Sequence, residues 1–379
     1  MKSRNLKQKV SFLFIGAVMA FANQGQATEN VSQNPATATP AAATQTSGFV
    51  KMDTGHAVAY EYSDAGSDAP IVVTLTGLIY PLQNLQEFAD GLAAKKISSL
   101  RIAFSTQGES IRKINQSEKP YFMEALNPLS PASTYLVTED SLVEDVVAVI
   151  KSLPLKNRKL YLATLSYSGY ISEALLNKHG DLFQGHLMYS PGMKPSHRYD
   201  PKGEQSHQAF VASLSFWSWN PFMTATIDKN YDISIQTTMF NVMSPKKDVP
   251  GYVPDDVTFD QFFAGIFCLA RAVKYTDLTE SEETHSVRTR LVLASKEDPP
   301  MLKDQIRYFF KSEATQEMFL VQDAYHGIPG AHAPIAVQLL EDFIKSSPPA
   351  DKAGFVINLD GTKKSTLQIQ DIRDLEASL

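Results

Sequence analysis

Short apolar runs alternate with helical repeats of apolar residues along most of the chain. Apolar residues recur at helical spacing near residues 85–92, 142–150, 169–178, 302–310 and 335–343. The runs between them have the length and apolar character of buried strands: 71–75, 98–104, 159–165, 185–190, 289–295 and 317–323. Strands that alternate with helices predict an α/β fold with a mostly parallel central sheet flanked by helices.

Two segments interrupt this alternation. Residues 191–285 are rich in aromatic and Met residues and show no strand–helix repeat, so we expect an inserted, largely helical cap. Residues 348–379 hold two alternating runs around an Asp-Gly pair, which suggests a β-hairpin in a C-terminal extension. The main domain is therefore expected over residues 48–347.

The first residues resemble a targeting segment. Four basic residues precede a short apolar run and then small residues, as in a bacterial secretory signal peptide over residues 1–22, with cleavage as late as residue 27. An uncleaved membrane anchor is the alternative, although the run is short for a membrane span. Residues 28–47 are polar and rich in Ala, Thr and Pro, which predicts a disordered linker. We expect an exported protein, periplasmic or extracellular, without a stable membrane span after cleavage.

Composition and motifs argue against nucleic-acid binding, disulfide bonds and a metal or nucleotide site. The net charge of −6 and the lack of a basic run argue against nucleic-acid binding. The only cysteine is Cys268, so the chain can form no intrachain disulfide. The histidines are dispersed, and the sequence has neither a zinc-hydrolase motif nor a glycine-rich nucleotide loop, so no metal or cofactor is predicted. The oligomeric state stays open.

A serine lies where one strand turns into a helix. In LATLSYSGYISEALL, an apolar run is followed by Ser166, Ser168 and then a helical repeat. A serine on such a bend presents its hydroxyl at the carboxyl edge of the sheet, in front of a helix N-terminus that favours a developing oxyanion. Ser166 is the preferred nucleophile. Ser168, one turn into the helix, is the alternative, and an ordinary helix N-cap is the non-catalytic interpretation.

A serine hydroxyl needs a histidine that accepts its proton and an acid that orients the histidine. Both occur after later strands, in the chain order serine, acid, histidine. SKEDPP follows one strand and supplies Asp298, with Glu297 as the alternative acid. QDAYHG follows the next strand and supplies His326, with His332 as the alternative base.

With these residues in place, the chain resembles the α/β-hydrolase fold superfamily over residues 48–347. SKEDPP is similar to the acid loop of that family, which favours Asp298, and residues 191–285 stand where the family inserts a cap. The usual Gly-x-Ser-x-Gly elbow is here Thr164-Leu165-Ser166-Tyr167-Ser168. This form of the elbow also resembles the acyl-protein thioesterases of bacterial luminescence systems.

The resemblance further implies an oxyanion hole made of backbone N–H groups. Thr76-Gly77 takes the place of the family's His-Gly pair, so one donor would be Leu78 or Ile79. The second donor would be Tyr167, the residue after the nucleophile.

These features predict an exported serine hydrolase that cleaves a carboxyl ester or thioester through an acyl-enzyme. The aromatic-rich cap suggests an apolar small-molecule or lipid acyl substrate. Two alternatives stay open: a peptidase or amidase on the same triad, and a non-catalytic binding protein that retains the fold.

Overall fold

The computed structural model describes residues 44–52, 56–78, 80–105, 110, 137–155, 157–193, 278, 285–297 and 299–379. The expected signal peptide and almost all of the expected cap lie outside these residues. So do Ile79, Cys268 and Asp298. In the part of the chain that is described, no helix has the length and apolar character needed to cross a membrane.

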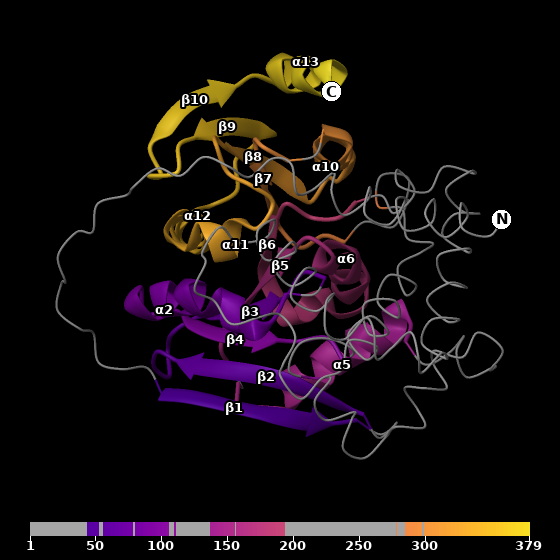
Figure 1. The fold of residues 1–379 in the computed structure, drawn as a ribbon, viewed down its shortest axis with the longest axis vertical. Helices are drawn as coiled ribbons and strands as arrows, with labels where there is room; N and C mark the ends of the chain where they lie inside the picture. Colours follow the sequence, from indigo (N-terminus) through magenta and orange to yellow (C-terminus); the bar gives the residue numbers. More distant parts are fainter. Residues whose placement is uncertain are drawn as a thin grey trace, which may run out of the picture.

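Ten strands form one sheet in the order β1-β2-β4-β3-β5-β6-β7-β8-β9-β10 (Figure 1). The pairs from β4 to β9 are all parallel, and the antiparallel pairs lie at the two ends of the sheet. This arrangement confirms the predicted α/β class. The strands are β1 (Thr44–Lys51), β2 (Ala57–Asp64), β3 (Ile71–Leu75), β4 (Ser98–Ile102), β5 (Leu160–Leu165), β6 (Phe183–Tyr189), β7 (Thr289–Ala294), β8 (Thr315–Val321), β9 (Ala353–Ile357) and β10 (Lys363–Leu367).

Helices cover both faces of the sheet (Figure 1). One face carries η1 (Leu82–Leu85), α2 (Gln86–Ala94), α11 (Ile328–Ala331) and α12 (Ala333–Lys345). The other carries α5 (Glu139–Ser152), α6 (Ser168–His179), η3 (Gly180–Leu182), α10 (Pro299–Lys311) and α13 (Ile369–Ser378). The central strands β3, β4, β5 and β7 are buried along their whole length, because each packs against helices on both faces. Two large apolar cores result, one on each side of the sheet.

The two ends of the sheet extend it beyond the expected domain. β1 begins at Thr44, inside the segment 28–47 expected to be linker, because its backbone pairs with β2 from that residue onward. At the other end, β9 and β10 pair antiparallel around a turn that contains Gly361, whose φ is +82°. β9 also pairs in parallel with β8, so the C-terminal segment continues the main sheet.

Candidate active site

Ser166 is the residue on which strand β5 turns into helix α6. Its φ is +54°, a left-handed conformation that costs a non-glycine residue about 1–3 kcal/mol. Three backbone hydrogen bonds hold it there. Its N–H donates to the carbonyl of Tyr189 at 3.1 Å, and its carbonyl accepts from Gly169 at 2.9 Å and Gly192 at 2.7 Å. The half-buried Ser166 side chain is therefore fixed at the carboxyl edge of the sheet.

Both glycine positions of the usual elbow carry hydroxyl residues, and the structure gives each hydroxyl a partner. Ser168 is fully buried, and its Oγ accepts from the N–H of Leu165 at 2.8 Å. The same Oγ lies 3.0 Å from the carbonyl of Leu75 and 2.9 Å from that of Leu165. Thr164 Oγ1 shares a 2.8 Å hydrogen bond with His186 Nε2. A fully buried hydroxyl bonded to backbone groups is a poor nucleophile, so these contacts favour Ser166 over Ser168.

Among the described residues, three of the five non-glycine residues with positive φ lie at this edge of the sheet. Positive φ values also occur at Ser190, directly after β6, and at Asp323, shortly after β8. Both residues, like Ser166, follow parallel strands at their carboxyl ends. Strained residues held by their surroundings are typical of functional sites, and the carboxyl edge is where open α/β sheets bind their ligands.

His326 lies after β8 and shares a hydrogen bond with Glu297, which follows β7. His326 Nδ1 is 2.6 Å from Glu297 Oε2, and the two side chains are 14% and 2% exposed. The structure therefore joins the preferred histidine to the alternative acid. Asp298, the preferred acid, lies outside the described residues.

The acid loop and the histidine loop are also held together through their backbones. The N–H of Lys296 donates to the carbonyl of Ala324 at 3.0 Å, and the N–H of Asp323 donates to Ser295 Oγ at 2.8 Å. These contacts place Glu297 and His326 at fixed positions beside the carboxyl end of the sheet. The alternative base, His332, lies further along the chain between α11 and α12.

Two segments that are expected to supply oxyanion donors adjoin Ser166: the loop after β3 and the start of α6. A Cβ atom on Gly77 would come within 3.3 Å of Ser166 Cβ, so the loop after β3 runs directly against the elbow. Leu78 follows in that loop and is half-buried, whereas Ile79 lies outside the described residues. Tyr167 caps α6, and its ring packs edge-on against Phe104 at 5.6 Å. The first turn of α6 thus faces the same region as the loop that contains Leu78.

No family model matches the sequence, and no curated protein matches it. Solved structures do match. A laboratory-evolved variant of potato epoxide hydrolase is similar with a TM-score of 0.56 and 13% identity, over 80% of this chain and 99% of that one. An epoxide hydrolase from Vigna radiata is similar with a TM-score of 0.52 and 13% identity, over 79% and 98%.

The chain has the α/β-hydrolase fold. At this level of identity the likeness shows the fold alone. The α/β-hydrolase fold has a sharp strand-to-helix bend and loops after later strands at the carboxyl edge of its sheet. In this chain Ser166 lies on the bend after β5, Glu297 lies in the loop after β7 and His326 lies in the loop after β8.

Proposed function

We propose that the protein is a serine hydrolase that cleaves a carboxyl ester or thioester. One observation carries the proposal. Ser166 stands in a left-handed bend at the carboxyl edge of the sheet, and the loops at that edge hold a histidine oriented by a buried carboxylate. A serine held in a strained turn and an imidazole held by an acid are the two parts that nucleophilic acyl transfer needs.

In this proposal Ser166 Oγ attacks the acyl carbonyl while His326 Nε2 accepts its proton. Glu297 accepts the hydrogen bond from His326 Nδ1 and stabilises the imidazolium that forms. The N–H groups of Leu78 and Tyr167 would bind the oxyanion. His326 then passes the proton to the leaving group, and water hydrolyses the acyl-enzyme by the same steps in reverse.

The substrate class is inferred from the sequence. The segments FVASLSFWSWNPFM and FDQFFAGIFCLARAV lie in the expected cap and are rich in apolar side chains, which favours an apolar acyl group. The expected signal peptide supports a location outside the cytoplasm. Acyl carrier protein and coenzyme A are cytoplasmic, so a lipid or a small ester fits better than their thioesters.

Labelling with a fluorophosphonate tests the proposal. The serine oxygen displaces fluoride from phosphorus, and intact mass spectrometry counts the adducts. We expect one adduct on the wild-type protein and on Ser168→Ala, and none on Ser166→Ala. Circular dichroism of each variant confirms that it is folded. A folded wild-type protein that never labels would favour the non-catalytic binding protein instead.

A substrate panel separates the two enzymatic alternatives. Chromogenic esters of increasing acyl length are compared with aminoacyl amides on the same preparation. We expect ester hydrolysis that rises with acyl length and is lost in Ser166→Ala. Amide cleavage that exceeds ester cleavage would identify a peptidase or amidase.

A further inference from the structure

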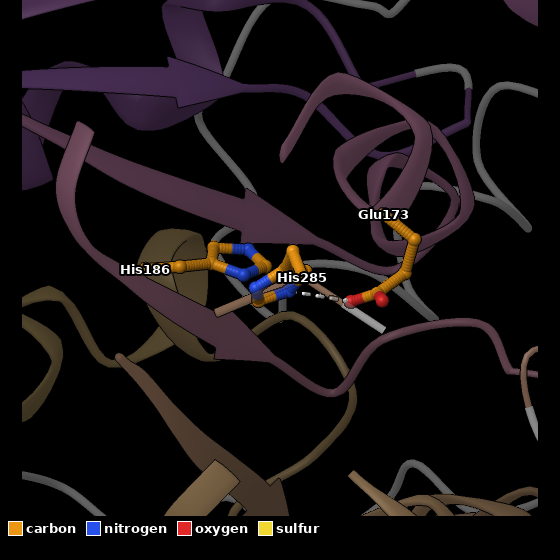
Figure 2. Close-up of side chains that lie close together, drawn as sticks. All are labelled: Glu173, His186 and His285. Carbon is orange, nitrogen blue, oxygen red and sulfur yellow. Dashed lines mark hydrogen bonds and ion pairs between the residues drawn. The ribbon is translucent and has the colours of Figure 1, made fainter. Parts of the chain in front are cut away.

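Three ionisable side chains meet in the core behind the elbow. Glu173 lies on α6, His186 lies on β6, and His285 precedes β7 (Figure 2). Their exposed fractions are 5%, 0% and 7%, so all three are buried. One ligand atom from each lies within 4.8 Å of the corresponding atoms of the other two. Carboxylates and imidazoles rarely share a buried space without a charge or hydrogen bonds to compensate them.

The hydrogen bonds within this cluster are incomplete. His285 Nε2 lies 3.3 Å from Glu173 Oε1, and Tyr308 donates its hydroxyl to the same oxygen. His186 Nε2 is bonded to Thr164. Among the described residues, Nδ1 of His186 and Nδ1 of His285 have no hydrogen-bond partner. A buried polar atom without a partner costs about 1–3 kcal/mol, so the unpartnered Nδ1 of His186, close to the pair of His285 and Glu173, requires a physical explanation.

We propose that Glu173, His186 and His285 bind a zinc ion. Two imidazoles and one carboxylate are a donor set that zinc accepts, whereas calcium and magnesium require more oxygen ligands. Zinc–nitrogen bonds of about 2.0–2.1 Å in a tetrahedral site separate neighbouring ligand atoms by about 3.4 Å. The contact between His285 and Glu173 already has this length. A small movement of His186 would bring the third ligand to the same separation, and water would supply the fourth.

The surroundings of His186 fit a metal ligand. A ligating imidazole usually bonds to a protein group through its other nitrogen, which fixes the orientation of the ring. Thr164 fulfils this role for His186, which leaves Nδ1 for the metal.

The proposed zinc ion would stabilise the fold and take no part in catalysis. Its ligands join the neighbouring elements α6 and β6 to the segment that enters β7, which lies about a hundred residues further along the chain. Cys268 cannot form an intrachain disulfide, so the chain lacks the usual covalent link of exported proteins. A metal link of this kind contributes its binding free energy directly to folding. The inference is independent of the proposed hydrolase activity.

Zinc titration of the full-length protein, free of any metal-binding tag and stripped with a chelator, tests the site. A chromophoric zinc indicator measures affinity and stoichiometry. We expect one zinc per chain and a higher melting temperature with zinc. His285→Gln should weaken binding by about 100-fold or more and abolish the thermal shift. The matched control is His56→Gln, since His56 is also buried and bonded to a carboxylate, that of Asp145, at 2.8 Å. It should keep the wild-type stoichiometry.

X-ray absorption of the zinc-loaded wild-type protein tests the same site without a variant, in case His285→Gln does not fold. We expect two imidazole ligands, with the remaining ligands oxygen. A folded wild-type protein that binds no zinc at equimolar concentration would overturn the proposal. So would a ligand shell without imidazole, or binding that is equally tight in folded His285→Gln.

Discussion

His326 Nδ1 lies 2.6 Å from Glu297 Oε2, and the Glu297 side chain is only 2% exposed. A charge-assisted hydrogen bond this short fixes both the tautomer and the orientation of the imidazole. Because Nδ1 donates to the carboxylate, Nε2 is left to accept a proton from a substrate or a nucleophile. The contact therefore makes Glu297 the candidate acid of the site.

Replacement of this acid should affect catalysis far more than binding. We expect Glu297→Gln to lower kcat by about 10³–10⁴-fold, because the amide cannot stabilise the imidazolium and favours the wrong tautomer. KM should change little, since Glu297 is buried behind the histidine. The measurement is ester hydrolysis at saturating substrate.

Asp298→Asn is the matched control for this prediction. It changes the neighbouring carboxylate in the same loop by the same chemical step. We expect kcat within the range of the wild-type protein. If Asp298→Asn lost the activity and Glu297→Gln retained it, Asp298 would be the acid and the contact of His326 with Glu297 would be structural.

The ambiguity between these two acids shows where sequence reasoning stops. Strands and helices were predictable because apolar spacing is a local signal, and the strands indicated the loops in which a serine, an acid and a histidine were expected. Glu297 and Asp298 are adjacent, and which of them faces His326 depends on the turn between β7 and α10. Asp298 precedes a Pro at the start of a helix, and this sequence pattern is also typical of a helix N-cap. The pattern around Asp298 therefore has a non-catalytic explanation.

The cluster of Glu173, His186 and His285 had no sequence signal at all. Metal motifs are recognised by short spacings on one element, whereas these residues come from three elements, and a long segment separates His285 from the other two. Only the pairing of β5 with β6 and of β6 with β7 brings them together. The sequence does show that Thr164 and Ser168 replace the two glycines of the usual elbow. It does not show their hydrogen-bond partners, because these depend on how the strands pair.

Ser168 should contribute more to stability than an ordinary buried serine. We expect Ser168→Ala to lower the free energy of unfolding by about 1–3 kcal/mol, since it leaves the N–H of Leu165 without this acceptor. Urea unfolding measures the change. Ser172→Ala is the control: Ser172 is equally buried on the same helix, but in the described part of the chain its hydroxyl donates to the carbonyl of Gly169 and accepts from no backbone N–H. An equal loss in both variants would contradict a special role of Ser168.

Gly169 should tolerate no side chain, although it lies in a helix. A Cβ there would come within 2.6 Å of Pro191 Cβ and 3.2 Å of the carbonyl oxygen of Gly192. We expect Gly169→Ala to destabilise the fold by about 1–3 kcal/mol through overpacking, which outweighs the higher helix propensity of alanine. Gly192 also donates to the carbonyl of Ser166, so a shift of this segment should slow fluorophosphonate labelling as well.

Gly180→Ala provides the comparison at the other end of α6. Its Cβ would lie 3.1 Å from a methyl group of Val287, the end of a side chain that is able to move. We expect a smaller loss of stability and an unchanged labelling rate. A Gly169→Ala protein as stable and as reactive as the wild type would show that the Pro191 segment adapts freely.

Lys352 should make stability depend on pH in the alkaline range. Its ammonium group donates to carbonyls at the end of α10, among them that of Ser312 at 2.7 Å. Burial lowers the pKa of Lys352 from 10.5 to about 8. Between these values the unfolded chain binds the proton and the folded chain does not, so the contribution of this residue to stability rises with pH. Below about pH 8 both states are protonated, and the contribution no longer changes.

Urea unfolding at pH 7.5, 8.5 and 9.5 measures this effect on the wild-type protein and on Lys352→Met. The quantity of interest is the difference between their free energies of unfolding, because the contributions of the other titrating groups cancel in it. The stability of the wild type relative to the variant should increase from the lowest to the highest pH. Lys345→Met is the control, since Lys345 is an exposed lysine paired with Glu341. The difference for that variant should stay constant over the same range. A flat or falling difference for Lys352→Met would mean that the carbonyls of α10 hold the lysine charged in the folded protein.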